Sequence, residues 1–298
     1  MSRLNLRGIF PPIPTPFIKG NVAYDKLILN VKKWNKTGIR GFVVLGSNGE
    51  YVYLSEEEKR KIVKTVIKKA AKGKLIIAGT GCESTRETIK LTKDCAQLGA
   101  DLALVVTPFY YGGKINTKVL INHYTTIADN SPIPILLYNV PKFTHINLGV
   151  DIVSMLSKHP NIIGIKDSSG DLSLMVSYIQ STPKNFKIWV GCDTLILAAL
   201  IYGAAGAVAA SASVVPDLVV SIYEHYKKGD LAKALEAQYR LAPLRRMFTL
   251  GSTNTAMLKA AANLLGLEVG DPIAPVHKLS DEKEEQLRAL LVEQGILR

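Results

Sequence analysis

Two short apolar segments of the chain end in side chains that can take part in carbonyl chemistry. Lys166 closes the segment 161–166, and Tyr138 closes the segment 133–138. Short runs rich in Ile and Leu predict buried strands. Burying an unpaired ammonium group is costly, so a lysine on such a strand is rarely there for packing. A lysine that gives up its proton attacks ketones, and we therefore expect Lys166 to form an imine with a carbonyl substrate.

The side chains near these strand ends suggest a division of labour. An imine on Lys166 would act as an electron sink for making or breaking a carbon–carbon bond. The phenol of Tyr138 could relay protons during that reaction. The turn Ser47-Asn48-Gly49 follows another short apolar segment and offers backbone N–H groups and two short polar side chains. Such a turn is suited to hold a carboxylate next to the ketone.

Apolar segments alternate with longer helical segments along the first 228 residues. Helix start signals precede several helical segments, namely Ser55, Ser84 and Asp171. Strict alternation predicts parallel strands with right-handed crossovers, and eight units in about 220 residues predict an α/β fold of the (β/α)8 TIM barrel type. The expected strands span residues 8–14, 41–46, 75–79, 101–107, 133–138, 161–166, 187–191 and 206–210. In such a barrel the chemistry lies at the carboxyl ends of the strands.

The remainder of the chain, residues 229–298, shows helical patterns without strands. Three helices are expected there, over residues 230–247, 252–265 and 281–294. No Pro-, Gly- or Ser-rich linker separates this part from residues 1–228. We therefore predict a catalytic barrel over 1–228 and a C-terminal helical extension over 229–298 that packs on it.

Composition argues against several classes of protein. No segment reaches the roughly 18 apolar residues of a membrane span, and prolines break the start of the chain, so we expect a cytoplasmic protein. Three scattered cysteines and five scattered histidines predict neither disulfides nor a metal site. The net charge of +12 comes largely from helical segments such as 56–74, which we interpret as solvated faces. Nucleic-acid binding is a competing hypothesis, but no recognition motif supports it.

The ordered set of motifs resembles the pyruvate-dependent class I aldolases, the family that includes dihydrodipicolinate synthase and N-acetylneuraminate lyase. Each motif alone is weak, but the set follows the family's order over nearly the whole chain. The matching motifs are Pro14-Thr15-Pro16-Phe17, Gly46-Ser47-Asn48-Gly49-Glu50, Gly79-Thr80-Gly81, Pro108-Phe109-Tyr110, Tyr138-Asn139-Val140-Pro141 and Gly164-Ile165-Lys166-Asp167-Ser168.

The resemblance implies a role for each matching residue. Lys166 would form the Schiff base with pyruvate or another 2-oxo acid, and Tyr138 would shuttle protons. Ser47 would supply the relay hydroxyl, and Ser47 with Asn48 would bind the carboxylate of the 2-oxo acid. Tyr110 would complete the relay from a neighbouring subunit. The family implies a homotetramer, built as a dimer of dimers, with no metal and no organic cofactor.

Three further positions are candidates for substrate contacts. Val208 lies in the Gly- and Ala-rich eighth strand, where small residues leave room for a ligand, and Gly49 belongs to the carboxylate-binding turn. Asp193 follows the seventh strand and could contact a substrate hydroxyl, although it could equally cap a helix.

Two departures from the synthase pattern bear on the substrate. Synthases usually have Thr-Thr where this chain has Ser47-Asn48, and usually have an arginine where this chain has Phe143. A phenyl ring cannot make the bidentate contact that arginine makes with a carboxylate. Lys142 or His145 could replace the lost charge.

The Ser-Asn pair resembles the 4-hydroxy-2-oxoglutarate aldolase branch, which yields pyruvate and glyoxylate, and this is the function we favour. Dihydrodipicolinate synthesis, a sugar-acid aldolase or dehydratase, and a silent 2-oxo acid binder are the alternatives.

Overall fold

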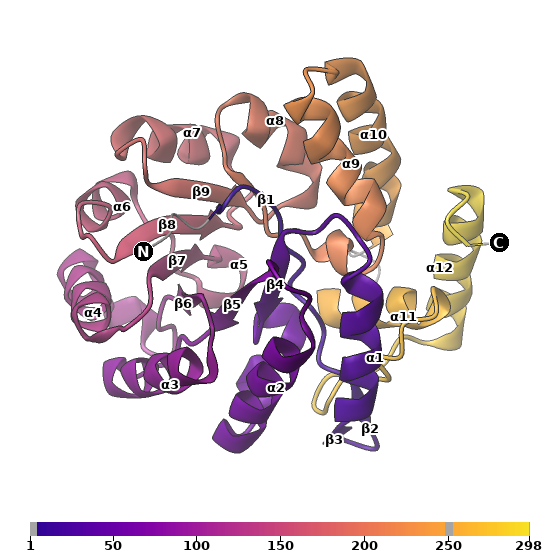
Figure 1. The fold of residues 1–298 in the computed structure, drawn as a ribbon, viewed down its shortest axis with the longest axis horizontal. Coiled ribbons are helices and arrows are strands. Elements are labelled where there is room, and N and C mark those ends of the chain that lie inside the picture. The colour runs from indigo at the N-terminus through magenta and orange to yellow at the C-terminus, as the bar shows by residue number, and fades with distance from the viewer. Residues whose placement is uncertain (1–4, 248–252, 298) are drawn as a thin grey trace.

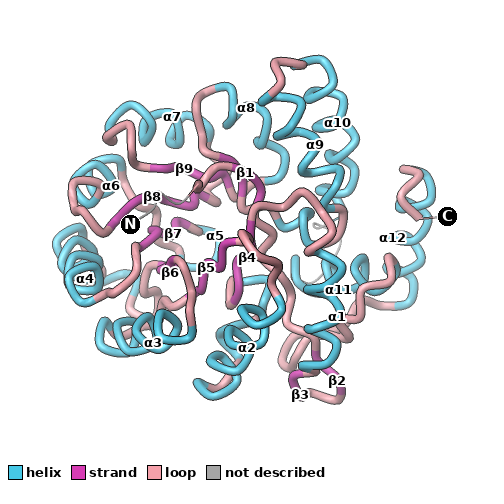
Figure 2. The backbone as a smooth tube through the Cα atoms, viewed as in Figure 1, coloured by secondary structure: helices cyan, strands magenta, loops and turns pink. Residues whose placement is uncertain are grey.

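A ring of parallel strands surrounded by helices forms most of the molecule. The computed structural model describes residues 5–247 and 253–297. Within these residues, eight parallel strands stand in the centre and helices lie around them (Figures 1 and 2), which confirms the predicted (β/α)8 barrel. The strands are β1 (Gly8–Ile9), β4 (Gly41–Val44), β5 (Leu75–Gly79), β6 (Leu102–Val106), β7 (Ile135–Asn139), β8 (Ile162–Asp167), β9 (Lys187–Val190) and β10 (Gly206–Ala207).

The barrel closes where its first strand meets both the last strand and the second. β1 pairs with β10, while the contact with β4 is a single parallel bridge between Pro12 and Val43. Val43 N–H donates to Pro11 O at 2.9 Å, and Ile13 N–H donates to Val43 O at 3.0 Å. The strand predicted over 8–14 is shorter in the structure because Pro11 and Pro12 have no N–H to donate to a ladder.

A small antiparallel hairpin that the sequence did not predict follows β1. It consists of β2 (Phe17–Ile18) and β3 (Asn21–Val22). Lys19 and Gly20 connect them with φ values of 50° and 76°, the left-handed conformation that tight hairpin turns require. Strands of two residues are too short to give a periodic pattern, so the sequence carries no strand signal here.

The outer helices begin where the sequence predicted. Ser55 and Glu58 form a capping box at α2 (Glu56–Lys69), and the side chains of Ser84 and Asp171 cap α3 (Thr85–Leu98) and α7 (Leu172–Ser181). The other helices of the barrel are α1 (Tyr24–Trp34), α4 (Thr117–Asn130), α5 (Pro141–Thr144), α6 (Val150–Leu156), α8 (Ile196–Ile201) and α9 (Pro216–Lys227). Short 3-10 turns are η1 (Ser47–Gly49), η2 (Tyr51–Tyr53), η3 (Gly112–Lys114), η4 (Asp193–Leu195) and η5 (Ala210–Ser213).

The C-terminal extension packs against one side of the barrel. It contains α10 (Leu231–Met247), α11 (Asn254–Leu264) and α12 (Asp281–Glu293), with α10 beside α9 (Figure 1). The predicted start of the second helix, Ser252, lies outside the described residues, and Thr253 caps α11. Asn30 of α1 exchanges two hydrogen bonds with the backbone of Glu268, and Lys26 pairs with the Glu268 carboxylate. The extension is therefore tied to the first helix of the barrel.

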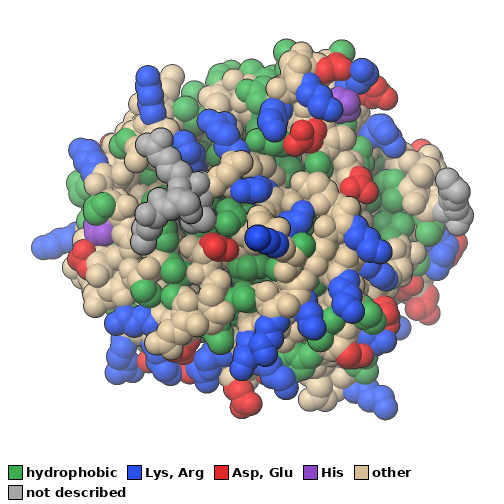
Figure 3. Space-filling view, viewed as in Figure 1, with side chains coloured by type: hydrophobic (Ala, Val, Ile, Leu, Met, Phe, Trp, Pro, Cys, Tyr) green, Lys and Arg blue, Asp and Glu red, His purple; other side chains and the backbone are tan. Residues whose placement is uncertain are grey.

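Charged side chains are spread over the surface. On the face shown in Figure 3, lysines and arginines lie over the whole visible surface, with acids between them. Some cationic side chains of α2 and α3 form ion pairs with neighbouring acids; for example, Arg60 Nη1 lies 3.2 Å from Asp94 Oδ2. Such pairs fit the interpretation of solvated helix faces. Among the described helices, none is both long and apolar enough to cross a membrane.

One buried histidine makes stability sensitive to acid. The side chain of His123 in α4 is 4% exposed, and its Nδ1 lies 2.8 Å from Thr85 Oγ1 at the start of α3. Burial lowers the pKa of His123 from 6.5 to about 4. The folded protein therefore keeps this imidazole neutral at a pH where the unfolded chain would protonate it.

We expect the free energy of unfolding to fall as the pH drops from about 6.5 to about 4, because only the unfolded state takes up a proton at His123 in that window. The contribution of this group is about 3 kcal/mol. Urea unfolding at several pH values would measure it. His123→Gln should flatten the profile over this window, whereas the exposed-site control His277→Gln should leave it unchanged; equal profiles for wild type and His123→Gln would contradict the assignment.

Candidate active site

Lys166 and Tyr138 lie side by side inside the carboxyl end of the barrel. They are paired residues of the neighbouring strands β8 and β7, so their side chains share one face of the sheet. The Nζ atom of Lys166 lies 4.1 Å from the centre of the Tyr138 ring. The two residues are 4% and 5% exposed. The lysine is thus an enclosed amine next to a phenol, as the sequence predicted.

Ser47 reaches the same point from a third strand. Its Oγ lies 3.3 Å from the Tyr138 hydroxyl, so the two hydroxyls are within hydrogen-bonding distance of each other. The turn that presents Ser47 begins at Leu45, which has a φ of 60°. A Cβ atom on Gly79 would lie 2.1 Å from Leu45 O, so this close approach requires glycine in the adjacent strand β5. The predicted Gly79 turn thereby helps to position Ser47.

These side chains open into a cavity of about 210 Å³. The predicted residues that line it are Ser47, Asn48, Tyr138, Phe143, Lys166, Asp193 and Val208. Lys142, the proposed replacement for the missing arginine, also lines it. Arg245 of α10 and Asn254 of α11 come from the extension and were missed, because nothing in the sequence brings a C-terminal helix to the barrel mouth. The cavity is therefore completed by both parts of the chain.

A buried polar network holds the two central strands in register. Asn139 and Asp167 follow Tyr138 and Lys166 directly and are themselves paired residues. Asn139 Nδ2 donates to Asp167 Oδ1 at 2.8 Å, and Ser169 Oγ donates to Asp167 Oδ2 at 2.8 Å. Burial raises the pKa of Asp167, while the hydrogen bonds from Ser169 and Asn139 oppose that rise. The sequence signal for this network was the adjacency of both residues to Lys166 and Tyr138.

The Asp193 carboxylate binds Ser211 in the 3-10 turn η5. Its Oδ2 accepts a 2.6 Å hydrogen bond from Ser211 Oγ and a 3.2 Å hydrogen bond from Ser211 N–H. The carboxylate therefore satisfies a backbone N–H group at the start of η5, a helical turn that is distant in sequence. Burial raises the pKa of Asp193, and Ser211 and then Arg245 oppose that rise. Asp193 remains a candidate substrate contact, since it lines the cavity.

Other predicted positions lie outside the cavity. Tyr110 is 74% exposed and packs edge-on against Tyr111, with ring centres 4.9 Å apart, in a separate groove. Gly49 uses its N–H within the turn, donating to Gly46 O at 2.9 Å. His145 ends α5 in the exposed loop and does not line the cavity, so Lys142 is the side chain that reaches this space.

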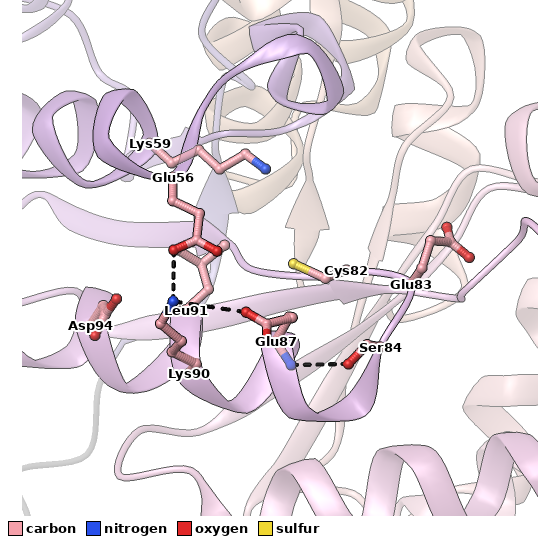
Figure 4. Close-up of a pocket in the computed structure, with 9 residues that line it drawn as sticks. All are labelled: Glu56, Lys59, Cys82, Glu83, Ser84, Glu87, Lys90, Leu91 and Asp94. Atoms are coloured by element: carbon pink, nitrogen blue, oxygen red, sulfur yellow. Dashed lines mark hydrogen bonds and ion pairs between the residues drawn. The ribbon is translucent and has the colours of Figure 1, made fainter.

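A second hollow, of about 250 Å³, lies between α2 and α3 (Figure 4). Its charged side chains bind one another, since Lys90 Nζ lies 2.7 Å from Glu56 and 3.8 Å from Glu87. Burial raises the pKa of the Cys82 thiol, which disfavours a reactive thiolate. In residues 5–247 and 253–297, no three His, Cys, Asp or Glu side chains gather in a way that could hold a metal ion. Carbonyl chemistry is thus best placed at Lys166.

Comparison with known proteins agrees with this geometry. The sequence model of the Dihydrodipicolinate synthetase family matches residues 5–294. The chain belongs to this family. Among its relatives, the 4-hydroxy-tetrahydrodipicolinate synthase of Methanothrix thermoacetophila is 41% identical over 293 residues, covering 98% of each chain. The corresponding protein of Methanopyrus kandleri is 35% identical, covering 98% of this chain and 97% of that one.

Solved structures of the Dihydrodipicolinate synthetase family have the same fold. The prophage protein YagE of E. coli K12, a family member determined in complex with pyruvate, superposes with a TM-score of 0.93 at 30% identity, covering 97% of this chain and 99% of that one. The synthase from Thermotoga maritima gives 0.93 at 29% identity, with 98% and 99% covered. As a family member, the protein is a lyase of the pyruvate-dependent class I aldolase type.

Asn139→Ala should lower both stability and turnover, because it leaves the buried Asp167 carboxylate without one donor and loosens the ends of β7 and β8. We expect a loss of about 1–3 kcal/mol in the free energy of unfolding and a drop in kcat of about tenfold or more. Chemical denaturation and steady-state kinetics would measure the two effects. Asn147→Ala is the matched control, since the exposed Asn147 accepts a hydrogen bond from the Asn139 side chain and does not contact Asp167 in that bond. Unchanged kcat in Asn139→Ala would refute the positioning role.

Proposed function

We propose that the protein is a Schiff-base aldolase that cleaves 4-hydroxy-2-oxoglutarate to pyruvate and glyoxylate. The observation that carries the proposal is the enclosed amine of Lys166, 4.1 Å from the Tyr138 ring, with Ser47 Oγ 3.3 Å from the Tyr138 hydroxyl. An amine nucleophile and a hydroxyl relay within one cavity are the groups that imine chemistry needs.

The cleavage can be written with these three residues. Lys166 Nζ attacks C2 of the 2-oxo acid, and loss of water leaves a protonated imine. Tyr138, in contact with Ser47, gives its proton to the departing water and, as the phenolate, then accepts the proton of the C4 hydroxyl as the C3–C4 bond breaks. The bonding electrons pass to the imine nitrogen, which gives an enamine and releases the aldehyde. Protonation at C3 and hydrolysis then release pyruvate and the free lysine, so the reaction as written needs no metal or organic cofactor.

The charges around the cavity favour a substrate with two carboxylates. The cations Lys142 and Arg245 line it, and Asp193 is the single acid among the described lining residues. Lys142 Nζ is held 3.4 Å from Asn254 Oδ1. 4-Hydroxy-2-oxoglutarate carries one carboxylate for the Ser47-Asn48 turn and a second for these cations. Aspartate semialdehyde offers one carboxylate but also brings an ammonium group, which a predominantly cationic wall disfavours.

The second candidate is the synthesis of 4-hydroxy-tetrahydrodipicolinate from pyruvate and aspartate semialdehyde. Relatives named for that activity, at up to 41% identity among those compared, favour it. Phe143 argues against it, because this side chain is 49% exposed at the cavity where synthases usually have an arginine. Sugar-acid substrates and a silent 2-oxo acid binder are further outcomes that the assays below separate.

We also propose that a second copy of the chain completes the relay with Tyr110. An open groove of about 340 Å³ adjoins the cavity at Ser47 and Phe143 and is lined by exposed apolar side chains, including Val52, Tyr53 and Phe109. A phenol from another subunit could enter there, which would fit the homotetramer expected from the sequence.

The cytoplasmic location expected from the sequence stays a prediction.

Reduction with borohydride in the presence of pyruvate should attach a reduced pyruvyl group to Lys166, because borohydride traps the imine. Peptide mass spectrometry would locate the adduct. Lys166→Met should show no adduct and lose all detectable turnover while keeping its circular dichroism spectrum. Turnover in Lys166→Met, or an adduct on another lysine only, would rule out this mechanism.

Pyruvate release should be faster from 4-hydroxy-2-oxoglutarate than the condensation of pyruvate with aspartate semialdehyde, because the cavity wall is cationic. Lys142→Met should raise KM for 4-hydroxy-2-oxoglutarate about tenfold, the effect of losing one charge-assisted contact. Pyruvate trapping should stay unchanged. Lys184→Met, an exposed lysine outside the cavity, is the control. Faster turnover of aspartate semialdehyde by wild type would favour the synthase instead; trapping without turnover of either substrate would favour the silent binder.

A further inference from the structure

A buried ion pair joins the turn that carries Ser47 to the C-terminal extension. Glu50 follows η1 directly and has a φ of 56°. Its Oε1 lies 2.7 Å from the Nζ of Lys259 in α11, and the two side chains are 2% and 0% exposed. Neither the imine mechanism nor the cavity lining around Lys166 uses this pair, so its burial requires a separate explanation.

The surroundings of the pair fix both of its ends. Glu50 Oε2 accepts a 2.9 Å hydrogen bond from Ile273 N–H, in the segment after α11. Lys259 Nζ donates to Asp271 O at 3.0 Å and lies 4.2 Å from the centre of the Phe17 ring. The carboxylate and the ammonium group are thus held by two segments of the extension and by the hairpin strand β2.

Glu50 is coupled tightly to the turn. Its N–H donates to Ser47 O at 3.1 Å, and Thr15 Oγ1 holds the neighbouring Gly49 carbonyl at 2.7 Å. A displacement of Glu50 would therefore also move Ser47, because the Glu50 N–H to Ser47 O hydrogen bond closes a single turn of backbone. Ser47 and Asn48 of this turn line the cavity around Lys166.

Stability alone is a poor explanation for the pair. Two charges taken out of water lose hydration energy, and replacing a buried ion pair by neutral groups of similar volume is often neutral or stabilising. Geometry is what such a pair can provide, because its distance and direction are narrowly defined.

We propose that Lys259 is a positioning residue that, through Glu50, fixes the Ser47-Asn48 turn and thereby sets the affinity for the 2-oxo acid carboxylate. This inference rests on the proposed function, because it takes that carboxylate as the ligand of the turn. It makes the extension a part of the binding site, although Lys259 itself does not touch the substrate.

The ionisation of Lys259 gives a pH signature of this role. Burial lowers the pKa of Lys259 to about 8, and the facing carboxylate of Glu50 and the charge of Asp271 oppose that change. Lys259 therefore loses its charge as the pH rises through about 8, and the pair with Glu50 is lost above that value. Substrate affinity should weaken over the same range only where the pair is present.

The test uses a double variant that removes both charges. Glu50→Gln with Lys259→Met in the full chain leaves no unpaired buried charge, so its thermal midpoint should stay close to that of wild type. The pyruvate concentration that gives half-maximal borohydride trapping should nevertheless rise about tenfold or more, because small misplacements of binding groups weaken binding strongly. Its dependence on pH between 7 and 9 should be weaker than that of wild type.

A control pair separates positioning from simple attachment of the extension. Lys26→Met with Glu268→Gln removes the partly exposed ion pair that links α1 to the extension, and it should leave trapping unchanged. Wild-type pyruvate dependence in a folded Glu50→Gln/Lys259→Met variant would overturn the inference. If that variant does not fold, the single variant Lys259→Arg, which keeps the charge, provides the test. Lys259→Arg should bind pyruvate with near wild-type affinity. A loss of affinity of about tenfold in Lys259→Arg would also overturn the inference. If the wild-type protein itself does not trap pyruvate, the proposed function and this inference are both refuted. This outcome can be told apart from a failure of the inference alone, in which wild type and variant trap pyruvate equally well.

Discussion

The pairing of β7 with β8 is the constraint on which the site depends. Because the two strands are parallel and Tyr138 pairs with Lys166, the amine and the phenol leave the sheet on the same side. A shift of one residue would turn one side chain into the helix layer and separate the two groups. The network of Asn139 and Asp167, one position further along both strands, maintains this register with buried hydrogen bonds. The chemistry is thus set by backbone pairing before any substrate binds.

Much of this arrangement was predictable from the sequence because it is local. The alternation of apolar strands and capped helices predicted the barrel, and a barrel brings the strand ends together, so Lys166, Tyr138 and Ser47 could be placed in one site without coordinates. The sequence could not decide between the two roles of Asp193, because a short polar residue after a strand satisfies several local patterns equally well. The choice between them depended on Ser211, which is distant in sequence.

What could not be predicted depends on contacts between segments far apart in the chain. Arg245 and Asn254 reach the cavity only because α10 and α11 pack against the barrel mouth. Lys259 reads in the sequence as an ordinary polar residue of an amphipathic helix, yet it is fully buried. The strand predicted over 8–14 was too long, since the pattern reports apolar residues but prolines decide which of them can join a ladder.

The pairing of β1 with β10 bears on the order in which the protein can mature during synthesis. Gly8 can pair with Gly206 only after most of the chain has been made, so the sheet has unpaired edges until then. Lys259 and Asn254 emerge later still. A chain cut short after the barrel would leave the Glu50 carboxylate without its partner Lys259. Nascent or truncated chains should therefore depend on chaperones and attract proteases until the extension has packed against the barrel.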